Sequence, residues 1–324
     1  MARAWSGVLA LLVACASAPA PGAPGVGRAH TARVLVLSTM LAEEGIGEWG
    51  FAALVEVDGR RLLFDTGCYP DTVLRNAQEL GVDLGEVEEV ILSHHHEDHT
   101  GGLVRLRTAL APAHPRALTR AHVAPGIFTP RRSGASGTAE ENPMLATREA
   151  YLAAGGAFLE HAGPVELYPG VWLTGPVPRP HPERNWSGDA TLLHADGQRS
   201  EDTLPEDMSL VIDTTAGLIV ITGCGHAGVV NTLEHARRTI RAAPVHALIG
   251  GVHLFPAGDE RLTWTADELR ARGLQHFLGA HCSGIEATFF LRARCGLSRA
   301  TCVVAAVGSS FELGQGIDPL ALAR

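Results

Sequence analysis

Four side chains within one short stretch of the chain have the chemistry of metal ligands. His94, His96, Asp98 and His99 follow the segment 87–92, which is expected to be a buried strand. Residues two apart in an extended segment face the same way, so His94 and His96 can converge on one metal ion. Asp98 and His99 lie at the turn into a following helix, where they can serve a neighbouring site. Imidazole and carboxylate are suitable ligands for zinc, iron or manganese.

The same stretch holds two residues with no expected ligand role. His95 faces away from its neighbours, and Glu97 is expected to be solvated. A histidine-rich loop in solvent is the alternative explanation of the whole cluster. The apolar strand before it and Thr100-Gly101-Gly102 after it favour a metal site, because these glycines let a helix begin close to the metal.

Two further residues are candidates for contact with metal or substrate. His253 follows Gly250-Gly251 at the end of an apolar segment, so it could be a ligand, a substrate contact or a proton donor. A buried structural histidine is an equal alternative. Arg179 could pair with an anionic group of a substrate, or it could be a solvated loop arginine.

The elements around these residues alternate between strands and helices, which indicates an α/β protein with two sheets covered by helices. Expected strands span 34–37, 51–57, 61–64, 87–92, 209–213, 217–222, 247–249 and 301–307, and expected helices span 71–80, 102–110, 231–242 and 265–272. Asp58-Gly59 predicts a hairpin turn. Residues 125–205 are rich in Pro, Gly and Ser and are expected to form surface loops around an active site, with partial disorder of 133–141 and 188–202 as the alternative.

The composition is that of a globular protein that does not bind nucleic acid. The 324 residues are 46% hydrophobic and carry a net charge of −9, whereas a phosphate backbone requires a basic face. Without Cys15 the chain has an odd number of cysteines, which argues against a disulfide framework, although Cys295 and Cys302 could pair.

The N-terminal segment resembles a secretory signal. Residues 1–18 are interpreted as that signal, 19–31 as a linker and 32–324 as one domain. Cleavage after Ala16-Ser17-Ala18 would release the protein, whereas Leu12-Val13-Ala14-Cys15 resembles a lipobox in which Cys15 is lipidated, and we slightly favour the lipobox. We therefore expect export, to the periplasm or to a membrane through a lipid anchor, or otherwise secretion. No later apolar run reaches the roughly 18 residues of a membrane-spanning helix.

The motifs together resemble those of a known superfamily. Ser93-His94-x-His96-x-Asp98-His99-x-Gly101-Gly102 resembles the signature of the metallo-β-lactamase superfamily, and Leu63-Phe64-Asp65-Thr66-Gly67 resembles its first motif. The resemblance implies an αββα four-layer sandwich in which Asp65 orients a ligand histidine. A finer resemblance, to 7,8-dihydropterin-6-methyl-aminobenzene-phosphate synthase-like proteins, runs from about residue 33 to 307. It is carried by residues 48–51, 175–179, 221–231, 250–254 and 281–284.

This resemblance also implies further ligands and shows where the chain departs from the commoner pattern. His281 matches the histidine of the last motif and is expected to be a ligand. The commoner pattern has a histidine before the strand 209–213 and a bridging aspartate after the next strand; here 205–208 lacks the histidine and Cys224 replaces the aspartate. His226 is the expected substitute ligand. Cys224 is expected to be a small buried residue, with thiolate coordination as the alternative.

The predicted function is that of a metal-dependent hydrolase acting on a small-molecule substrate with a metal-activated water. One or two divalent ions are expected, with zinc the expected metal. A metal held by His94, His96 and His226 would polarise a substrate oxygen and lower the pKa of water toward ~7. Asp98 would orient that water as general base, or ligate a second metal with His99 and His281. The alternatives are a synthase-type transferase that forms a carbon–nitrogen bond on a pterin, and a metal- or ligand-binding protein without turnover.

Overall fold

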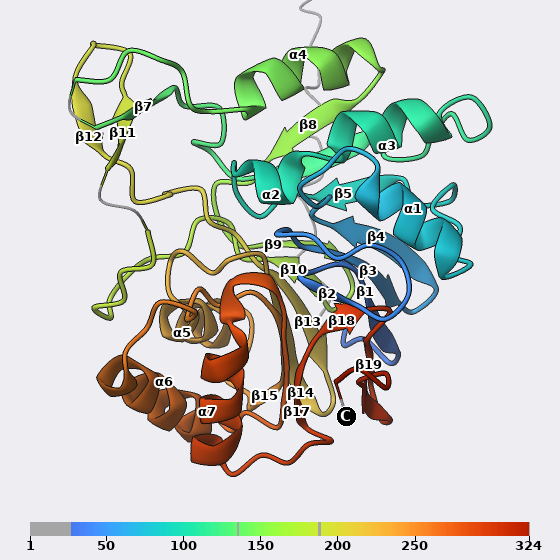
Figure 1. Ribbon diagram of the computed structural model, residues 1–324, viewed down its shortest axis with the longest axis vertical. Coiled ribbons are helices and arrows are strands. Elements are labelled where there is room, and N and C mark those ends of the chain that lie inside the picture. The colour runs from blue at the N-terminus through green and yellow to red at the C-terminus, as the bar shows by residue number, and fades with distance from the viewer. Residues whose placement is uncertain (1–26, 135, 187–188, 324) are drawn as a thin grey trace, which may run out of the picture.

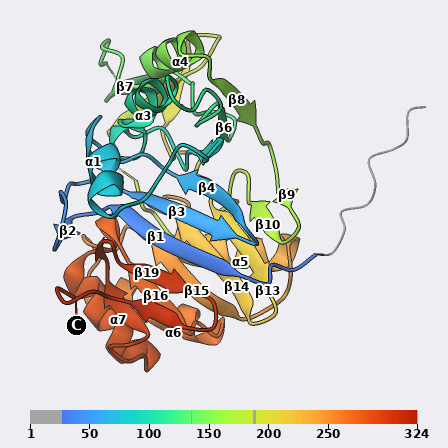
Figure 2. The same cartoon turned by 90° about the vertical axis from the view of Figure 1, so that its right-hand side faces the viewer.

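Two β-sheets pack face to face, and helices cover the outer side of each (Figure 1, Figure 2). The computed structural model describes residues 27–134, 136–186 and 189–323. The order of layers is helices, sheet, sheet, helices. This arrangement confirms the predicted αββα sandwich.

The first sheet combines the N-terminal strands with two strands from the C-terminal end. Its order is β20-β19-β1-β3-β4-β5-β6-β8. The bounds are β20 Gly316–Asp318, β19 Ser310–Glu312, β1 Ala32–Ser38, β3 Ala52–Val57, β4 Arg60–Phe64, β5 Glu89–Ile91, β6 Arg120–Val123 and β8 Ala157–Glu160. Strands β3 and β4 form the predicted hairpin, with φ of 48° at Asp58 and 79° at Gly59.

The second sheet is built from the C-terminal half of the chain in the order β17-β16-β15-β14-β13-β10-β9. The bounds are β17 Cys302–Val304, β16 His276–Gly279, β15 Val245–Gly250, β14 Gly217–Thr222, β13 Leu210–Thr214, β10 Val171–Leu173 and β9 Val165–Tyr168. Every residue of β14 and β15 is buried. Such strands are covered on both faces, which explains their continuous apolar sequences.

The helices divide into two sets that cover the two sheets (Figure 1). The first sheet is covered by α1 Thr72–Glu79, α3 Leu103–Leu110 and α4 Met144–Ala153, and the second by α5 Val229–Thr239, α6 Asp259–Ala271 and α7 Ile285–Cys295. A third apolar cluster fills the space between the sheets, where Phe51 and Phe64 pack with Ile221 and Ile249. No helix within the described residues is long and apolar enough to span a membrane.

The segment 125–205 is more ordered than its composition suggested. It contains α4, β8, β9 and β10, and it contributes β7 Arg131–Ser133, β11 Ala190–Leu193 and β12 Arg199–Glu201 to a separate three-stranded sheet. The expectation of surface loops was therefore wrong for these elements. Its Pro and Gly residues mark turns between short strands, which a reading of composition alone does not distinguish from irregular loops.

The N-terminal signal stays a prediction, whereas the end of the linker is part of the fold. Residues 1–18, read as a signal, lie outside the described residues. At the end of the predicted linker, Ala29 is buried and forms a β-bridge with Thr214. The described cysteines are all free, so Cys295 and Cys302 do not form a disulfide.

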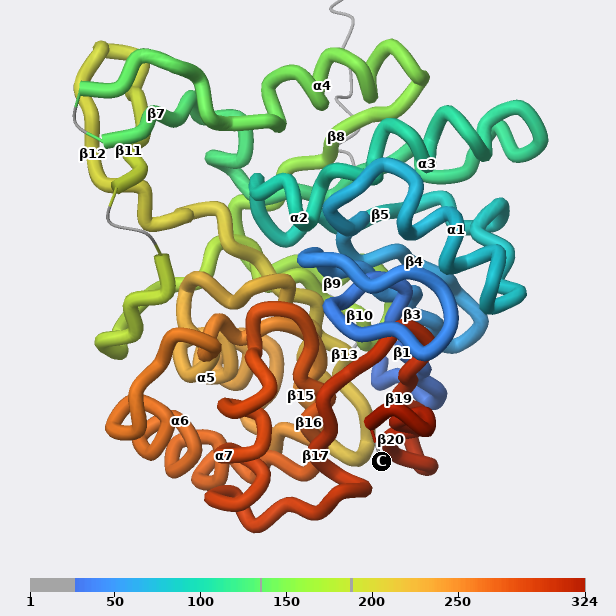
Figure 3. Tube along the Cα trace, viewed as in Figure 1, coloured from blue at the N-terminus to red at the C-terminus, as the bar shows by residue number. Residues whose placement is uncertain are grey.

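The sheet topology brings the candidate ligands to one region. Strand β4 runs parallel to β5, and β14, β15 and β16 are mutually parallel. The carboxyl ends of parallel strands meet at the same edge of a sheet, and this edge is where open α/β sheets bind ligands. The loops that follow these five strands carry the residues singled out above. A short helix, α2 Glu97–Thr100, holds Asp98 and His99 (Figure 3).

The junction between α2 and α3 requires a residue without a side chain, and this requirement is testable. A Cβ atom on Gly101 would lie 1.8 Å from the carbonyl oxygen of Cys68. We expect Gly101→Ala to lower the free energy of unfolding by about 1–3 kcal/mol through steric overlap. Urea denaturation measures the change. Gly163→Ala is the matched control, because a Cβ atom there meets nothing within 4 Å. Equal stabilities of the two variants would contradict this packing.

Candidate metal centre

The carboxylate of Asp65 joins the first motif to the histidine-rich loop. Asp65 follows β4, is fully buried and has a φ of 54°. One oxygen, Oδ1, accepts a hydrogen bond of 2.7 Å from the backbone N–H of Ser93, and Oδ2 accepts one of 2.7 Å from the Ser93 hydroxyl. Oδ2 also lies 2.7 Å from Nδ1 of His99. This contact places the proton of neutral His99 on Nδ1 and leaves Nε2 available as a ligand.

His94 and His96 present their rings to each other from the loop after β5. Their ring centroids are 4.6 Å apart. Nδ1 of His94 lies 2.9 Å from the Ser93 hydroxyl oxygen, whereas its Nε2 is buried without a hydrogen-bond partner. The nearest ligand atoms of His94, His96 and Asp98 lie within 4.8 Å of one another. These three side chains can therefore share one cation.

The loop after β14 brings a second segment against this cluster. His226 donates a hydrogen bond from Nδ1 to the backbone carbonyl of Asn185, and its Nε2 is buried without a partner. The close approach depends on Gly223, where a Cβ atom would lie 2.1 Å from the Ser93 hydroxyl oxygen. The hydrogen bond to Asn185 fixes the proton of His226 on Nδ1. Its Nε2 is therefore free to bind a metal, as in other ligand histidines.

The loop after β16 contributes His281. Its Nε2 lies 3.1 Å from Oδ2 of Asp98, at ion-pair distance but without the alignment of a hydrogen bond. Asp98, His99, Cys224 and His281 form a second group whose ligand atoms are all within 4.8 Å of one another. His281 has a φ of 47°, an unfavourable backbone conformation for a residue with a side chain. Such strain is typical of positions fixed for function.

Cys224 is shared by most of the candidate ligand groups. Its sulfur lies 3.1 Å from Nε2 of His99. Of the four groups in the described residues, three contain it: Asp98-His99-Cys224-His281, His94-Cys224-His226 and Cys224-His253-Cys282. The structure thus gives Cys224 a more central position than its sequence context indicated. Cys282 was not selected from the sequence, because only the fold brings it to Cys224.

A comparison with known proteins gives the family. The sequence profile of the Metallo-beta-lactamase superfamily matches residues 50–223, more than half of the chain. The protein belongs to the metallo-beta-lactamase superfamily. The match includes Asp65 and the four residues of the histidine-rich motif.

Individual relatives cover most of the chain. It is 29% identical over 278 residues to the 7,8-dihydropterin-6-methyl-4-(beta-D-ribofuranosyl)-aminobenzene-5'-phosphate synthase of Methanocaldococcus jannaschii, covering 81% of this chain and 91% of that protein. It is similar to Tm1679, described as a metal-dependent hydrolase of the beta-lactamase superfamily, with 27% identity and a TM-score of 0.66 over 81% of this chain and 93% of Tm1679. Zinc-bound PqqB from Methylobacterium extorquens shares the fold at 15% identity and a TM-score of 0.50, over 86% of this chain and 99% of PqqB.

The residues of this superfamily member fit a divalent metal ion. Burial, followed by neighbouring imidazoles, holds the pKa of His94, His96 and His226 well below its ordinary value, so these rings are neutral, as ligands must be. Buried nitrogens without partners are rare in folded proteins, and here Nε2 of both His94 and His226 lacks one. A bound cation would satisfy both atoms.

The groups around Asp98 have pKa shifts of different sign. Burial would raise the pKa of Asp98, but His99 and His281 lower it well below its usual range. Burial would lower the pKa of His99, but Asp98 and Asp65 raise it to about 9, so His99 must lose the proton on Nε2 when it binds a metal. Burial, followed by the Cys282 sulfur, raises the pKa of the Cys224 thiol. The cluster therefore holds an ionised carboxylate, while its thiol needs a cation to lose its proton near neutral pH.

His95 is turned away from the ligand cluster and joins a buried ion-pair network. Its Nδ1 lies 2.8 Å from Oε1 of Glu206, and Glu97 is exposed. Arg131 from β7 donates from Nη2 to both oxygens of Glu206 at 2.8 Å and from Nε to Asp202 at 2.7 Å. Sequence reasoning missed this network because its members come from distant segments. It attaches the small three-stranded sheet to the histidine-rich loop.

Arg179 does not join the cluster. Its Nη2 donates to the backbone carbonyl oxygens of Thr203 at 2.5 Å and Leu204 at 2.9 Å, and the side chain is half-buried. A role in binding an anionic substrate group therefore has no support from its contacts. His253 does lie at the cluster: its ring centroid is 4.7 Å from that of His226.

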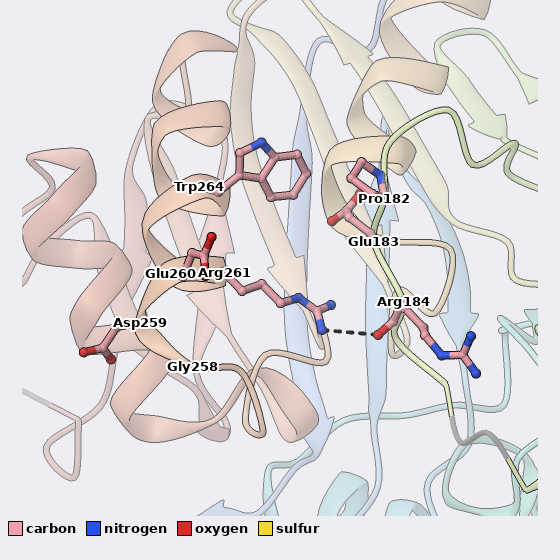
Figure 4. Close-up of a pocket in the computed structure, with 8 residues that line it drawn as sticks. All are labelled: Pro182, Glu183, Arg184, Gly258, Asp259, Glu260, Arg261 and Trp264. Carbon is pink, nitrogen blue, oxygen red and sulfur yellow. Dashed lines mark hydrogen bonds between the residues drawn. The ribbon is translucent and has the colours of Figure 1, made fainter.

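Two cavities among the described residues are large enough for a small molecule. One, of about 480 Å³, is lined by His96, Glu97 and residues of the 140–146 segment. The other, of about 590 Å³, lies between residues 182–184 and the start of α6 (Figure 4). There Nη1 of Arg261 donates to the carbonyl of Arg184 at 3.2 Å, and Trp264 lines the wall. Of these two cavities, the one beside His96 has a candidate ligand among its lining residues.

The shared position of Cys224 leads to a prediction about metal content. We expect Cys224→Ser to lower zinc affinity by more than the roughly 10- to 100-fold typical of residues that only support ligands. His226→Ala should also lower zinc affinity, because it removes an imidazole from the group that contains Cys224 and His94. Equilibrium dialysis with elemental analysis measures both effects. Cys295→Ser is the matched control. The Cys295 thiol donates a hydrogen bond to the carbonyl of Ala266 and belongs to no ligand group in the described residues.

Two outcomes would revise this assignment. Unchanged zinc binding in Cys224→Ser with loss in His226→Ala would make the sulfur a packing residue. Unchanged binding in both would move the third ligand elsewhere, with His253 as the next candidate.

Proposed function

We propose that this protein is a metal-dependent hydrolase that uses an activated water to attack a small-molecule substrate. The observation that carries the proposal is the group of buried imidazole nitrogens, left without partners, beside an ionised carboxylate and a thiol. Such a donor set can hold a cation and a proton acceptor within one site.

The ligand atoms fit zinc. His94, His96 and His226 supply nitrogen, Cys224 supplies sulfur and Asp98 supplies oxygen, and all three donor types are ordinary zinc ligands. The groups that share Cys224 could hold one ion or two. When bound, a divalent metal supplies a Lewis acid that polarises a substrate oxygen and lowers the pKa of a water molecule.

The chain itself supplies the proton acceptor and its orientation. The side chain of Asp98 is 18% exposed, so a substrate or water can reach it, whereas that of His281 beside it is fully buried. Because the neighbouring imidazoles keep Asp98 ionised, its carboxylate can accept a hydrogen bond from a water molecule and orient it for attack. Asp65 and Ser93 fix the loop that presents Asp98 and His99.

A synthase-type transferase is the second candidate. The relative from Methanocaldococcus jannaschii that is 29% identical over most of this chain is named as a 7,8-dihydropterin-6-methyl-4-(beta-D-ribofuranosyl)-aminobenzene-5'-phosphate synthase. The same metal site could serve carbon–nitrogen bond formation. A binding protein without turnover is the remaining alternative.

Turnover assays in ¹⁸O-labelled water distinguish these functions. Zinc-loaded protein would be tested on esters, lactones and phosphodiesters, and separately on a dihydropterin alcohol derivative with an arylamine. We expect a hydrolysis product that carries ¹⁸O, and a loss of kcat of roughly 10²- to 10⁴-fold in Asp98→Asn. Retention of bound zinc by that variant would show that the loss is not simply loss of metal.

The other outcomes decide against hydrolysis. A product that joins the two substrates without ¹⁸O would establish the synthase-type reaction. Zinc-loaded protein that turns over none of these compounds would favour the binding protein.

A further inference from the structure

Two large aromatic side chains are exposed beside the candidate metal centre. Trp49 is 47% exposed and Phe255 is 51% exposed. Their ring centroids are 5.4 Å apart with an interplanar angle of 80°. We call these two residues the aromatic pair. Exposed apolar residues that occur singly need no explanation, but adjacent ones commonly mark a binding surface.

Each member of the pair also contacts a histidine of the candidate centre. The ring of Trp49 lies 4.7 Å from that of His281, and the ring of Phe255 lies 5.3 Å from that of His253. Both histidines belong to candidate ligand groups. The aromatic pair is therefore directly next to the position where a substrate would react.

The loop that carries Trp49 is fixed by a buried carboxylate. Glu48 is 6% exposed. Its Oε1 accepts hydrogen bonds from the Ser38 hydroxyl at 2.6 Å and from the backbone N–H of Cys68 at 2.8 Å. Its Oε2 accepts one from the backbone N–H of Tyr69 at 2.9 Å. The backbone next to Trp49 is thus held in place before any ligand binds.

Phe255 is held by the segment that follows His281. Its backbone N–H donates to the carbonyl of Cys282 at 3.2 Å. Its Cα atom packs against Gly284, where a Cβ atom would lie only 2.8 Å away. Rings on pre-positioned backbone lose less conformational entropy when a ligand binds.

We propose that the aromatic pair is a binding subsite for a planar aromatic or heteroaromatic ring of the substrate, whose reacting atom lies at the metal centre. The inference rests on the proposed metal-dependent activity at this site and names its substrate class. Aromatic faces bind planar rings by offset stacking or edge-to-face contact. Trp49 and Phe255, which stand nearly perpendicular and are each about half exposed, leave ring surface free for such contacts.

Two other occupants of an exposed aromatic patch fit the molecule less well. A membrane surface with anionic lipids would be disfavoured by the net charge of −9. A second copy of the chain would cover the approach to the same histidines that the substrate must reach. Both are outcomes of the experiment below.

The test is calorimetric titration of the zinc-loaded full chain with 6-hydroxymethylpterin and with 4-aminobenzamide as planar probes. Cyclohexanecarboxamide is the non-planar comparison. Trp49→Leu and Phe255→Leu keep an apolar side chain but remove the ring. We expect each to raise the Kd of the planar probes roughly tenfold, with unchanged zinc content, and Trp49→Phe to recover most of the affinity. Trp264→Leu, in the other cavity, is the matched control and should bind the probes as the wild type does.

The outcomes separate this inference from the proposed function. Loss of planar-probe binding in both leucine variants supports the subsite even if the protein hydrolyses none of the compounds assayed. Unchanged affinity in both variants, equal binding of the non-planar compound, or no binding of either planar probe overturns it even if hydrolysis is found. Sedimentation would detect dimerisation or binding to vesicles. If either depends on Trp49 while binding of the planar probes does not, the inference is also overturned.

Discussion

The organisation of this site depends on one buried carboxylate. Asp65 has no exposed surface, and removing an ionised group from water is costly unless polar partners replace the solvent. Its partners are the backbone N–H and hydroxyl of Ser93 and Nδ1 of His99. Satisfying Asp65 therefore fixes the end of β4 against the histidine-rich loop. The contact with Asp65 also fixes the ring of His99, whose Nε2 lies 3.1 Å from the sulfur of Cys224.

A similar requirement holds the outer side of the same loop. Arg131 and Glu206 are fully buried, and each compensates the charge of the other. Removing one partner would leave an uncompensated charge in the interior, which is strongly destabilising. His95 is bound to Glu206, so the loop is fixed between Asp65 on one side and this ion pair on the other. This leaves His94 in a defined position with its Nε2 unpaired.

The sequence was informative where the signal was local. The hairpin at Asp58-Gly59 and the alternation of strands and helices followed from turn chemistry and hydrophobic patterns, and the structure confirmed them. The histidine-rich motif was recognisable because its members are adjacent in the chain. Helix α6 begins at Asp259 rather than near residue 265. Asp259 and Glu260 carry negative charge in the first turn, which stabilises a helix N-terminus.

Contacts between distant segments were not predictable in the same way. Cys224, His253 and Cys282 come from three loops that meet only because β14, β15 and β16 are parallel neighbours. Arg131 and Glu206 are 75 residues apart, and no local pattern connects them. The aromatic pair likewise joins segments from the two sheets. Such sites depend on how the strands are connected and ordered in the sheets, whereas a sequence pattern mainly predicts the helix or strand in which it lies.

Buried nitrogen and sulfur atoms, brought together by the loop that Asp65 anchors, are proposed to bind a metal ion directly. X-ray absorption at the zinc edge of the zinc-loaded full chain identifies the atoms bound to the metal. We expect nitrogen or oxygen neighbours at about 2.0–2.2 Å together with a sulfur neighbour at about 2.3 Å. A spectrum of zinc surrounded only by oxygen atoms, as in a hydrated ion on the surface, would contradict it.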